Sequence, residues 1–192
     1  MSALLVCYSD DMFPLADPLK QAMSRPLTST ITTYQADWPS SYRREAARLV
    51  RVFGSALDAV QHIGSTAVPG LSAKPEIDIL AIVNSLVHMD SWTESLAAFG
   101  YRRGGDLSEG HLFYKRDVEG VRTHKIHVCL AGHTKIDEML SFRDYLRRYD
   151  DARMKYQVLK LELEKNNVHG IGEYLRGKEP FIRGVLERLD RE

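Results

Sequence analysis

The stretch that organises this chain spans residues 62 to 79 and reads His62-Ile63-Gly64-Ser65-Thr66-Ala67-Val68-Pro69-Gly70-Leu71-Ser72-Ala73-Lys74-Pro75-Glu76-Ile77-Asp78-Ile79. It predicts a strand, a turn of small residues, a loop and a second strand over Pro75 to Val83. Side chains on a strand alternate between its two faces, so Glu76 and Asp78 share one face. The apolar run that continues to Val83 is typical of a strand covered on both faces.

The two acids and the turn before them together predict a metal-assisted phosphate site. Adjacent carboxylates at the end of a buried strand repel each other, and a divalent cation between them removes that repulsion. Gly64-Ser65 offers backbone N–H groups without a bulky side chain, which suits a phosphate. A solvated strand edge beside an ordinary turn would have the same spacing, so both interpretations stay open here.

The same residues resemble a known family. Gly64-Ser65, followed after twelve residues by Asp78-Ile79, is similar to the motif of the polymerase-beta-like nucleotidyltransferase superfamily. More narrowly, the string from residue 62 to residue 79 resembles the GrpB-like family. The resemblance extends roughly from Ile31 to Leu189 and includes Tyr34, Trp38-Pro39, Ile126-His127-Val128, the run from Phe142 to Arg147, Tyr156, Leu159-Lys160, Tyr174, Lys178 and Phe181.

The resemblance implies a fold and an activity. The fold is an α/β protein of the α+β type, with a nucleotidyltransferase-like mixed sheet flanked by helices and a C-terminal helical annex. The activity is binding of a nucleoside triphosphate with a divalent metal, Mg or Mn, and transfer of the nucleotide to a small-molecule acceptor. The alternative is a catalytically degenerate nucleotide-binding or accessory module linked to coenzyme A metabolism, because some GrpB-like domains are fused to dephospho-coenzyme A kinase.

The resemblance also assigns roles to residues. Asp78 and Glu76 are the expected catalytic metal ligands, and Gly64, Ser65 and Thr66 the expected holders of the β- and γ-phosphates. Further triphosphate contacts are expected from Lys74, Arg143, Lys160 and Lys178. For Lys74 the alternative is an ion pair with Glu76. Arg143 and Arg147 are four residues apart on a predicted helix, where they would clamp an anion or simply be solvated.

The third acid of active superfamily members, normally on a neighbouring strand, has no counterpart in this sequence. Histidines stand there instead. His124 and His127 are three residues apart and therefore face opposite sides of a strand. His127 would share a face with Lys125 and Cys129, where it could act as general base or as a metal ligand. A histidine hydrogen-bonded in the core is the alternative.

Composition narrows the class of protein. The chain has 192 residues, 44% of them hydrophobic, which is enough for one core and a helical annex. Its 26 basic and 26 acidic residues balance, which argues against a nucleic-acid or membrane partner. With Cys7 and Cys129 as its two cysteines, no apparent signal peptide and no long apolar run, a cytoplasmic location is predicted, and the oligomeric state is left open.

Periodicity and turn residues divide the chain into three parts: an N-terminal extension over 1–28, an α/β core over 29–135 and the annex over 136–192. Within the extension a short helix is predicted over Leu19 to Ser24, and Ile31 to Tyr34 is expected to add an edge strand. Helices are predicted over 38–53, 84–99, 136–149, 152–166 and 178–189, and later strands over 111–115 and 122–130, with a turn over 117–120. Over 152–166 there are two apolar rows, Met154, Val158 and Leu161 and then Tyr156, Leu159 and Leu163, which together predict a helix buried on a wide face. Trp92, Leu96 and Phe99 give a helical face over 84–99.

Overall fold

A mixed sheet forms the centre of the molecule. The computed structural model describes residues 27–191, so the predicted helix over Leu19 to Ser24 lies outside the described residues. The described residues form α2 (Trp38–Phe53), β1 (Leu57–Ile63), β2 (Ile77–Val83), α3 (Met89–Ala98), β3 (Tyr101–Arg103), β4 (His111–Val118), β5 (Val121–Leu130), α4 (Thr134–Arg148), α5 (Asp150–Lys165) and α6 (Ile171–Leu189). The strand order is β1-β2-β5-β4-β3, and β2 and β5 are parallel while the other neighbours are antiparallel. The predicted mixed α/β fold is confirmed.

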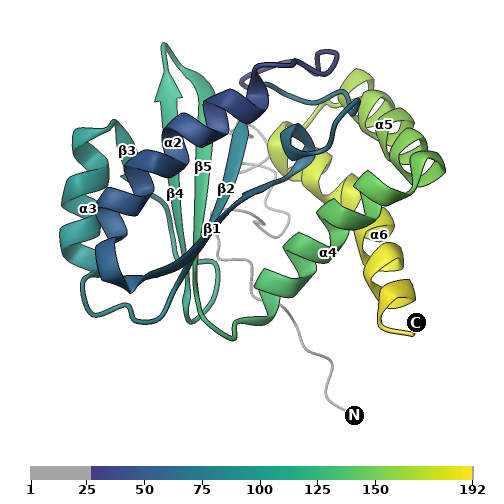
Figure 1. Cartoon of the computed structure of the whole chain (residues 1–192). Coiled ribbons are helices and arrows are strands. Elements are labelled where there is room, and N and C mark those ends of the chain that lie inside the picture. The colour runs from purple at the N-terminus through teal and green to yellow at the C-terminus, as the bar shows by residue number, and fades with distance from the viewer. Residues whose placement is uncertain (1–26, 192) are drawn as a thin grey trace.

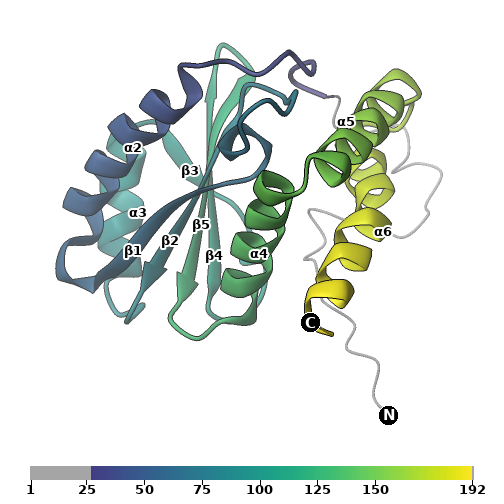
Figure 2. The same ribbon diagram turned by 45° about the vertical axis from the view of Figure 1, so that its right-hand side comes forward.

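Helices cover both faces of this sheet (Figure 2). On one face, Ile77 and Ile79 of β2 join a buried cluster with residues of α2 and α3. On the other face, Leu80 packs with Cys129 and with Ile136 of α4. Strand β2 is therefore covered on both sides, as its apolar run predicted.

The loop between β1 and β2 is built into the helical annex. Its residues Val68 and Leu71 are fully buried and pack with Leu146 of α4, Tyr156 of α5 and Val185 of α6. Figure 1 shows this loop between the edge of the sheet and the helices α5 and α6. The annex thus anchors the one loop that carries the family motif.

Several predicted elements differ from those observed. Strand β3 was not predicted because it has only three residues. Ile31 to Tyr34 forms a single bridge, Thr32 with Ala73, instead of a strand. Strand β4 continues to Val118, through the start of the predicted turn. Helix α6 begins at Ile171, seven residues before the predicted start, and its Gly177 lies close to α5, where an added Cβ would be 2.3 Å from Leu163 Cδ2.

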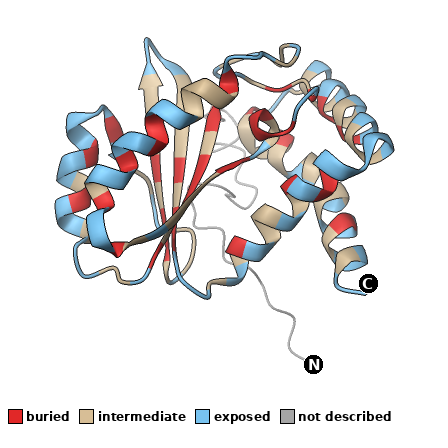
Figure 3. Cartoon of the chain, viewed as in Figure 1, coloured by how far each residue is buried: buried red, intermediate tan, exposed pale blue. Residues whose placement is uncertain are grey.

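The apolar rows predicted for α5 and α3 are only partly buried. Met154, Val158 and Leu161 are 52%, 50% and 42% exposed, so the prediction that they face the core is wrong. The buried side of α5 carries Tyr156, which belongs to the other predicted row, and Lys160, which belongs to neither row. Figure 3 shows this burial pattern along the helices. Phe99, beyond the end of α3, is also exposed, whereas Trp92 and Leu96 are buried.

A helix that spans a membrane needs about 20 predominantly apolar residues, and the helices within residues 27–191 do not meet this requirement.

Candidate functional site

The glycine turn and the second acid lie directly against each other. Ile63, the last residue of β1, pairs with Asp78 on β2, and Gly64 follows with φ +69°. A Cβ added to Gly64 would lie 2.4 Å from Asp78 Oδ2. Only glycine fits at this position, because a side chain would need both a left-handed backbone and the space of the carboxylate. The sequence prediction that turn and acid converge therefore holds for this pair.

A chain of hydrogen bonds joins the start of the loop to its end. The Thr66 hydroxyl donates to the Glu76 carbonyl at 3.1 Å, and His62 Nε2 lies 3.1 Å from Thr66 Oγ1. Since the single hydroxyl proton goes to Glu76, His62 Nε2–H is the donor to Thr66. Burial, helped by Arg147 and Arg143, lowers the pKa of His62 to about 4, so the ring is neutral at pH 7. Thr66 is buried and its side chain braces the loop, while its role as a phosphate contact stays a prediction.

Two arginines of α4 hold the same loop through its carbonyl oxygens. Arg143 donates to the carbonyl of His62 at 3.0 Å, and Arg147 donates twice to the carbonyl of Ala67, at 3.0 and 2.8 Å. Arg143 is buried and also pairs with Asp144. Both guanidinium groups are thus engaged by the backbone, because buried carbonyls need donors. Both arginines therefore brace the loop in this structure, and the anion clamp with the triphosphate contact of Arg143 stays a prediction.

The two acids share one cation that sequence reasoning did not single out. Lys125 of β5 places Nζ 2.5 Å from Glu76 Oε2 and 3.5 Å from Asp78 Oδ1. Lys125 is the residue paired with Asp78 across the parallel β2–β5 ladder. The available signal was alternation along β5, which puts Lys125 on the face opposite the core positions Ile126 and Val128. Glu76, Asp78 and Lys125 are called the acid–lysine triad below.

The three groups of the acid–lysine triad change one another's pKa values. Burial alone would lower the pKa of Lys125, but Asp78 and Glu76 outweigh it and raise the value to about 12. Burial would raise the pKa of Glu76, yet Lys125, Lys74 and the Ser29 hydroxyl together lower it. For Asp78, burial dominates and raises the pKa. Lys125 is therefore a permanent cation at neutral pH.

His127 lies on the face of the triad but apart from it. It pairs with Leu80, two residues beyond Lys125 along β5, or about 7 Å further along the strand. Its Nδ1 is 2.9 Å from His111 Nε2, and its ring lies against Phe113. Burial, and then His111, lowers the pKa of His127 to about 3. The geometry favours the core-histidine alternative over the predicted general base or metal ligand.

Three further lysines lie around the turn and the triad: Lys74 and Lys178 interact electrostatically with triad residues, and Lys160 contacts the turn. Lys160 of α5 is 2% exposed and donates to Ser65 Oγ at 3.1 Å and to the Ser72 carbonyl at 2.6 Å. Lys74 Nζ and Lys178 Nζ lie 4.4 and 4.5 Å from the centre of the Tyr174 ring. Together with Lys125 they form what we call the lysine cluster: Lys74, Lys125, Lys160 and Lys178.

Burial and neighbouring charges lower the pKa values of Lys160, Lys178 and Lys74. Burial, then Lys178, lowers the pKa of Lys160 to about 7. Burial, then Lys125, lowers the pKa of Lys178 to about 8, against the attraction of Asp78. Lys74 also has a lowered pKa, through burial, and is attracted by Glu76. Crowded ammonium groups of this kind favour an anionic ligand, which would restore their charge.

The carboxylates of Glu76 and Asp78 are the side chains of this site that could bind a divalent cation. Glu76 and Asp78 provide carboxylate oxygens on one face, and within residues 27–191 no group of three His, Cys, Asp or Glu side chains is arranged to hold an ion. Mg²⁺ in proteins commonly uses one or two carboxylates together with phosphate oxygens of its substrate. These residues therefore fit a cation that arrives with a phosphate ligand better than a cation held by the protein alone.

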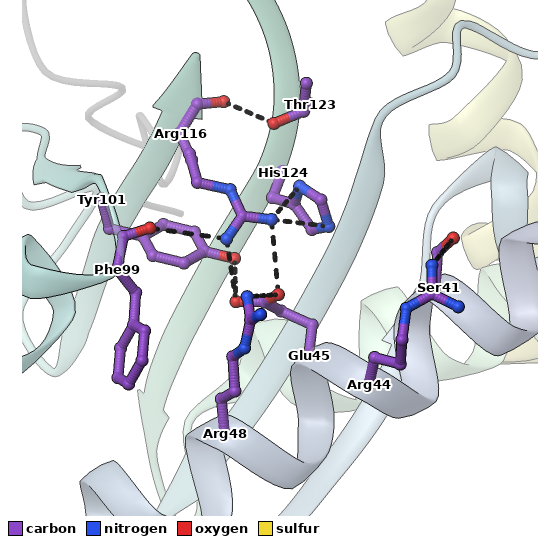
Figure 4. Close-up of polar contacts among 9 residues, drawn as sticks. All are labelled: Ser41, Arg44, Glu45, Arg48, Phe99, Tyr101, Arg116, Thr123 and His124. Carbon is purple, nitrogen blue, oxygen red and sulfur yellow. Dashed lines mark hydrogen bonds and ion pairs between the residues drawn. The ribbon is translucent and has the colours of Figure 1, made fainter. Parts of the chain in front are cut away.

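A second buried carboxylate, that of Glu45, projects from α2 toward the opposite face of the sheet (Figure 4). Glu45 Oε1 accepts from the Tyr101 hydroxyl at 2.9 Å and from Arg116 Nη1 at 3.2 Å. Its Oε2 accepts from Arg48 Nη1 at 3.1 Å and from Arg116 Nη2 at 3.3 Å. His124, directly before Lys125, packs its ring against Arg116 Nη2 at 2.7 Å. This Glu45 network accounts for His124, which faces away from the triad as predicted.

Comparison with known proteins gives the following matches. A family model described as GrpB protein matches residues 28–188. The UPF0157 protein BH1888 of Halalkalibacterium halodurans is 34% identical over 84% of this chain and 82% of its own length. The UPF0157 protein YqkA of Bacillus subtilis is also 34% identical, but the matched part spans only 47% of that protein. The crystal structure of GrpB from Enterococcus faecalis has 31% identity and a TM-score of 0.77, and covers 83% of this chain and 96% of its own.

Two further matches are more distant. A dephospho-CoA kinase of Mycolicibacterium paratuberculosis is 29% identical over 79% of this chain and 44% of its own length. The Cid1 poly(U) polymerase, solved bound to MgATP, has a TM-score of 0.51 at 12% identity and covers 77% of this chain and 50% of its own. At that identity the match shows a nucleotidyltransferase-like fold and no more.

Proposed function

Because the chain belongs to the GrpB family and has a nucleotidyltransferase-like fold, we propose that it binds a nucleoside triphosphate together with a divalent cation. The observation that carries the proposal is the convergence of Gly64, Asp78 and the lysine cluster near the N-terminal end of β2. These groups come from β2, β5, α5, α6 and the loop between β1 and β2. An ion pair with a purely structural role would require neither a glycine packed against the Asp78 carboxylate nor three further lysines near it.

Each part of the site has a role in this proposal. Ser65 and the backbone N–H groups of the turn face the β- and γ-phosphates, with Lys160 holding the serine hydroxyl in place. Lys178 and Lys74, both on the Tyr174 ring, neutralise the outer phosphate oxygens. Glu76 and Asp78 bind the cation that the triphosphate brings. That cation supplies charge neutralisation at the phosphates, which is what an attacking nucleophile requires.

We further propose transfer of the nucleotide to a small-molecule acceptor as the activity of this site. The alternative is binding without transfer, and one specific observation favours it. Lys125 occupies the strand position opposite Asp78, on the strand where active members of the superfamily place their third carboxylate. A lysine with a pKa raised to about 12 by those acids cannot serve as a general base at neutral pH.

Calorimetry tests the binding proposal directly. The wild-type chain is titrated with ATP, GTP, CTP and UTP, each with Mg²⁺ or Mn²⁺. Lys160→Met should weaken binding about tenfold or more, since it removes a buried ammonium beside the phosphate position. Lys155→Met is the matched control, because Lys155 lies on the same helix but is exposed. Absence of heat with all four nucleotides, or equal losses in both variants, would contradict the proposal.

Pyrophosphate release separates transfer from binding. The wild-type chain is incubated with the nucleotide that binds, a divalent cation and a panel of hydroxyl, amine and phosphate acceptors. Release with one acceptor that is lost in Asp78→Asn supports transfer. Binding without release across the panel supports the non-catalytic alternative.

A further inference from the structure

The position between the two acids is already filled by part of the protein. Lys125 Nζ contacts a carboxylate oxygen of Glu76 and one of Asp78, at 2.5 and 3.5 Å. Its side chain is 26% exposed, so Lys125 is not fully enclosed by the protein. A cation bridging two carboxylates on one sheet face is the arrangement that a divalent ion would otherwise adopt.

The backbone holds Lys125 in that position. Asp78 and Lys125 are directly paired across the parallel ladder, and the neighbours Ile77 and Ile79 pair with His124 and Ile126 in the same register. The residue after Lys125 is fully buried, and His124 before it is held by Arg116. The Lys125 backbone therefore cannot shift along the strand, although its long side chain can rotate away from the acids.

We propose that Lys125 is a built-in cation that excludes divalent metal from the free acid pair and gives way only when a polyphosphate competes for its ammonium group. This inference deepens the proposed function and rests on it, because it takes Glu76 and Asp78 as the place where the cation binds. The consequence is ordered use of the site: the free chain does not hold metal, and metal and nucleotide bind as one unit. Lys125 thereby sets the metal dependence of the site.

The surrounding lysines make this exchange possible. When the Lys125 ammonium leaves the acids, a triphosphate provides several oxygens that can accept its hydrogen bonds. The acids then receive the divalent ion in its place, so no buried charge is left without a partner. Lys178 interacts electrostatically with both Lys125 and Asp78, so it lies near both groups.

Manganese alone is the probe, without nucleotide. Free Mn²⁺ is followed by electron paramagnetic resonance while the wild-type chain, Lys125→Met and Lys125→Arg are titrated. Methionine keeps the length of the side chain and removes the charge, so we expect Lys125→Met to bind one Mn²⁺ at least about tenfold more tightly than wild type. Lys125→Arg keeps the cation and should behave like wild type.

Adding Asp78→Asn to Lys125→Met should abolish the gain, which ties the ion to the acid pair. A wild-type chain that binds Mn²⁺ as tightly as Lys125→Met, with the loss of binding in Asp78→Asn, would overturn the inference. So would a folded Lys125→Met that gains nothing. If circular dichroism shows that Lys125→Met is unfolded, the comparison of wild type with Asp78→Asn still decides, because a Mn²⁺ site that depends on Asp78 in the wild type contradicts exclusion by Lys125.

The same readout distinguishes this inference from the proposed function. A gain of Mn²⁺ affinity in Lys125→Met, together with no nucleotide binding by wild type, would support exclusion of metal by Lys125, but it would remove the proposed function and the release of Lys125 by a polyphosphate. Nucleotide binding by wild type without any gain of Mn²⁺ affinity in Lys125→Met would support the proposed function and overturn the inference about Lys125.

Discussion

Two buried carboxylate sites lie on opposite faces of one sheet, and they are satisfied in different ways. Glu45 receives four hydrogen bonds from Tyr101, Arg48 and Arg116, whose guanidinium group contacts both of its oxygens. Asp78 is paired with one lysine at 3.5 Å and retains 22% of its side-chain exposure. The rigid arginine site has no capacity left for a ligand. The lysine-held site does, because a flexible ammonium can leave.

Breaking the Glu45 network is the change with the largest expected effect. Glu45→Ala leaves Arg116 partly buried without its carboxylate, and losing one partner of a buried pair destabilises by about 3–5 kcal/mol. Urea denaturation measures the loss, and Glu94→Ala, an exposed glutamate on α3, is the control with an expected change within about 0.5 kcal/mol. Equal free energies of unfolding for the two variants would show that the Glu45 network does not stabilise the fold.

Gly64→Ala tests how tightly the turn and the acid are packed. The variant combines a left-handed backbone with a clash against Asp78 Oδ2, so we expect it to lose about 2 kcal/mol or more of unfolding free energy. Gly120→Ala has a similar positive φ but nothing within 4 Å, and it should lose only about 1 kcal/mol. In the double variant Gly64→Ala/Asp78→Ala part of the excess should be recovered, since the clash is gone. Equal losses at the two glycines would refute the close approach.

Removing Asp78 should affect the ligand far more than the fold. Asp78→Asn keeps the shape of the side chain and removes a carboxylate that burial already penalises. Its thermal unfolding should therefore stay close to wild type, with a change below about 1 kcal/mol, while the affinity for a nucleotide with Mn²⁺ falls about tenfold or more. A large loss of unfolding free energy with unchanged nucleotide affinity would show that Asp78, like Glu45, stabilises the fold and does not bind the ligand.

The smallest expected effect is a proton taken up with the ligand. The pKa of Lys160 is lowered to about 7, so at pH 8 most of this side chain is neutral. A polyphosphate favours the charged form, so binding should take up protons at pH 8 and weaken as the pH rises above about 7. Calorimetry in two buffers of different ionisation enthalpy measures the uptake, and Lys160→Met should reduce it. Identical binding heats in both buffers would contradict this linkage.

The sequence predicted the sheet and the meeting of turn and acid because both depend on local patterns. Alternation in β2 and the glycine before Ser65 determine which groups face one another. The partners of those groups depend on tertiary contacts that no spacing encodes. Lys125 reaches Asp78 only through the parallel register of β2 and β5, and Arg143 reaches the His62 carbonyl only because α4 packs beside that loop.

The faces of α5 illustrate the same limit. Its apolar row of Met154, Val158 and Leu161 satisfied helical periodicity, yet the structure buries Lys160 on another side of the helix, because the Ser65 hydroxyl and the Ser72 carbonyl provide its partners. A buried lysine cannot be recognised from hydrophobicity. The family resemblance named Lys160 as a triphosphate contact, which stays a prediction, and it did not indicate that the side chain is buried.

A crystal soaked with a non-hydrolysable nucleoside triphosphate and Mn²⁺ is the most direct measurement of the central claim. We predict an anomalous manganese peak between Glu76 and Asp78, phosphates against Ser65 and Lys178, and the Lys125 ammonium moved from the acids onto a phosphate oxygen. A triphosphate bound elsewhere, or Lys125 still paired with both carboxylates while the phosphates occupy the turn without a metal ion, would contradict the account.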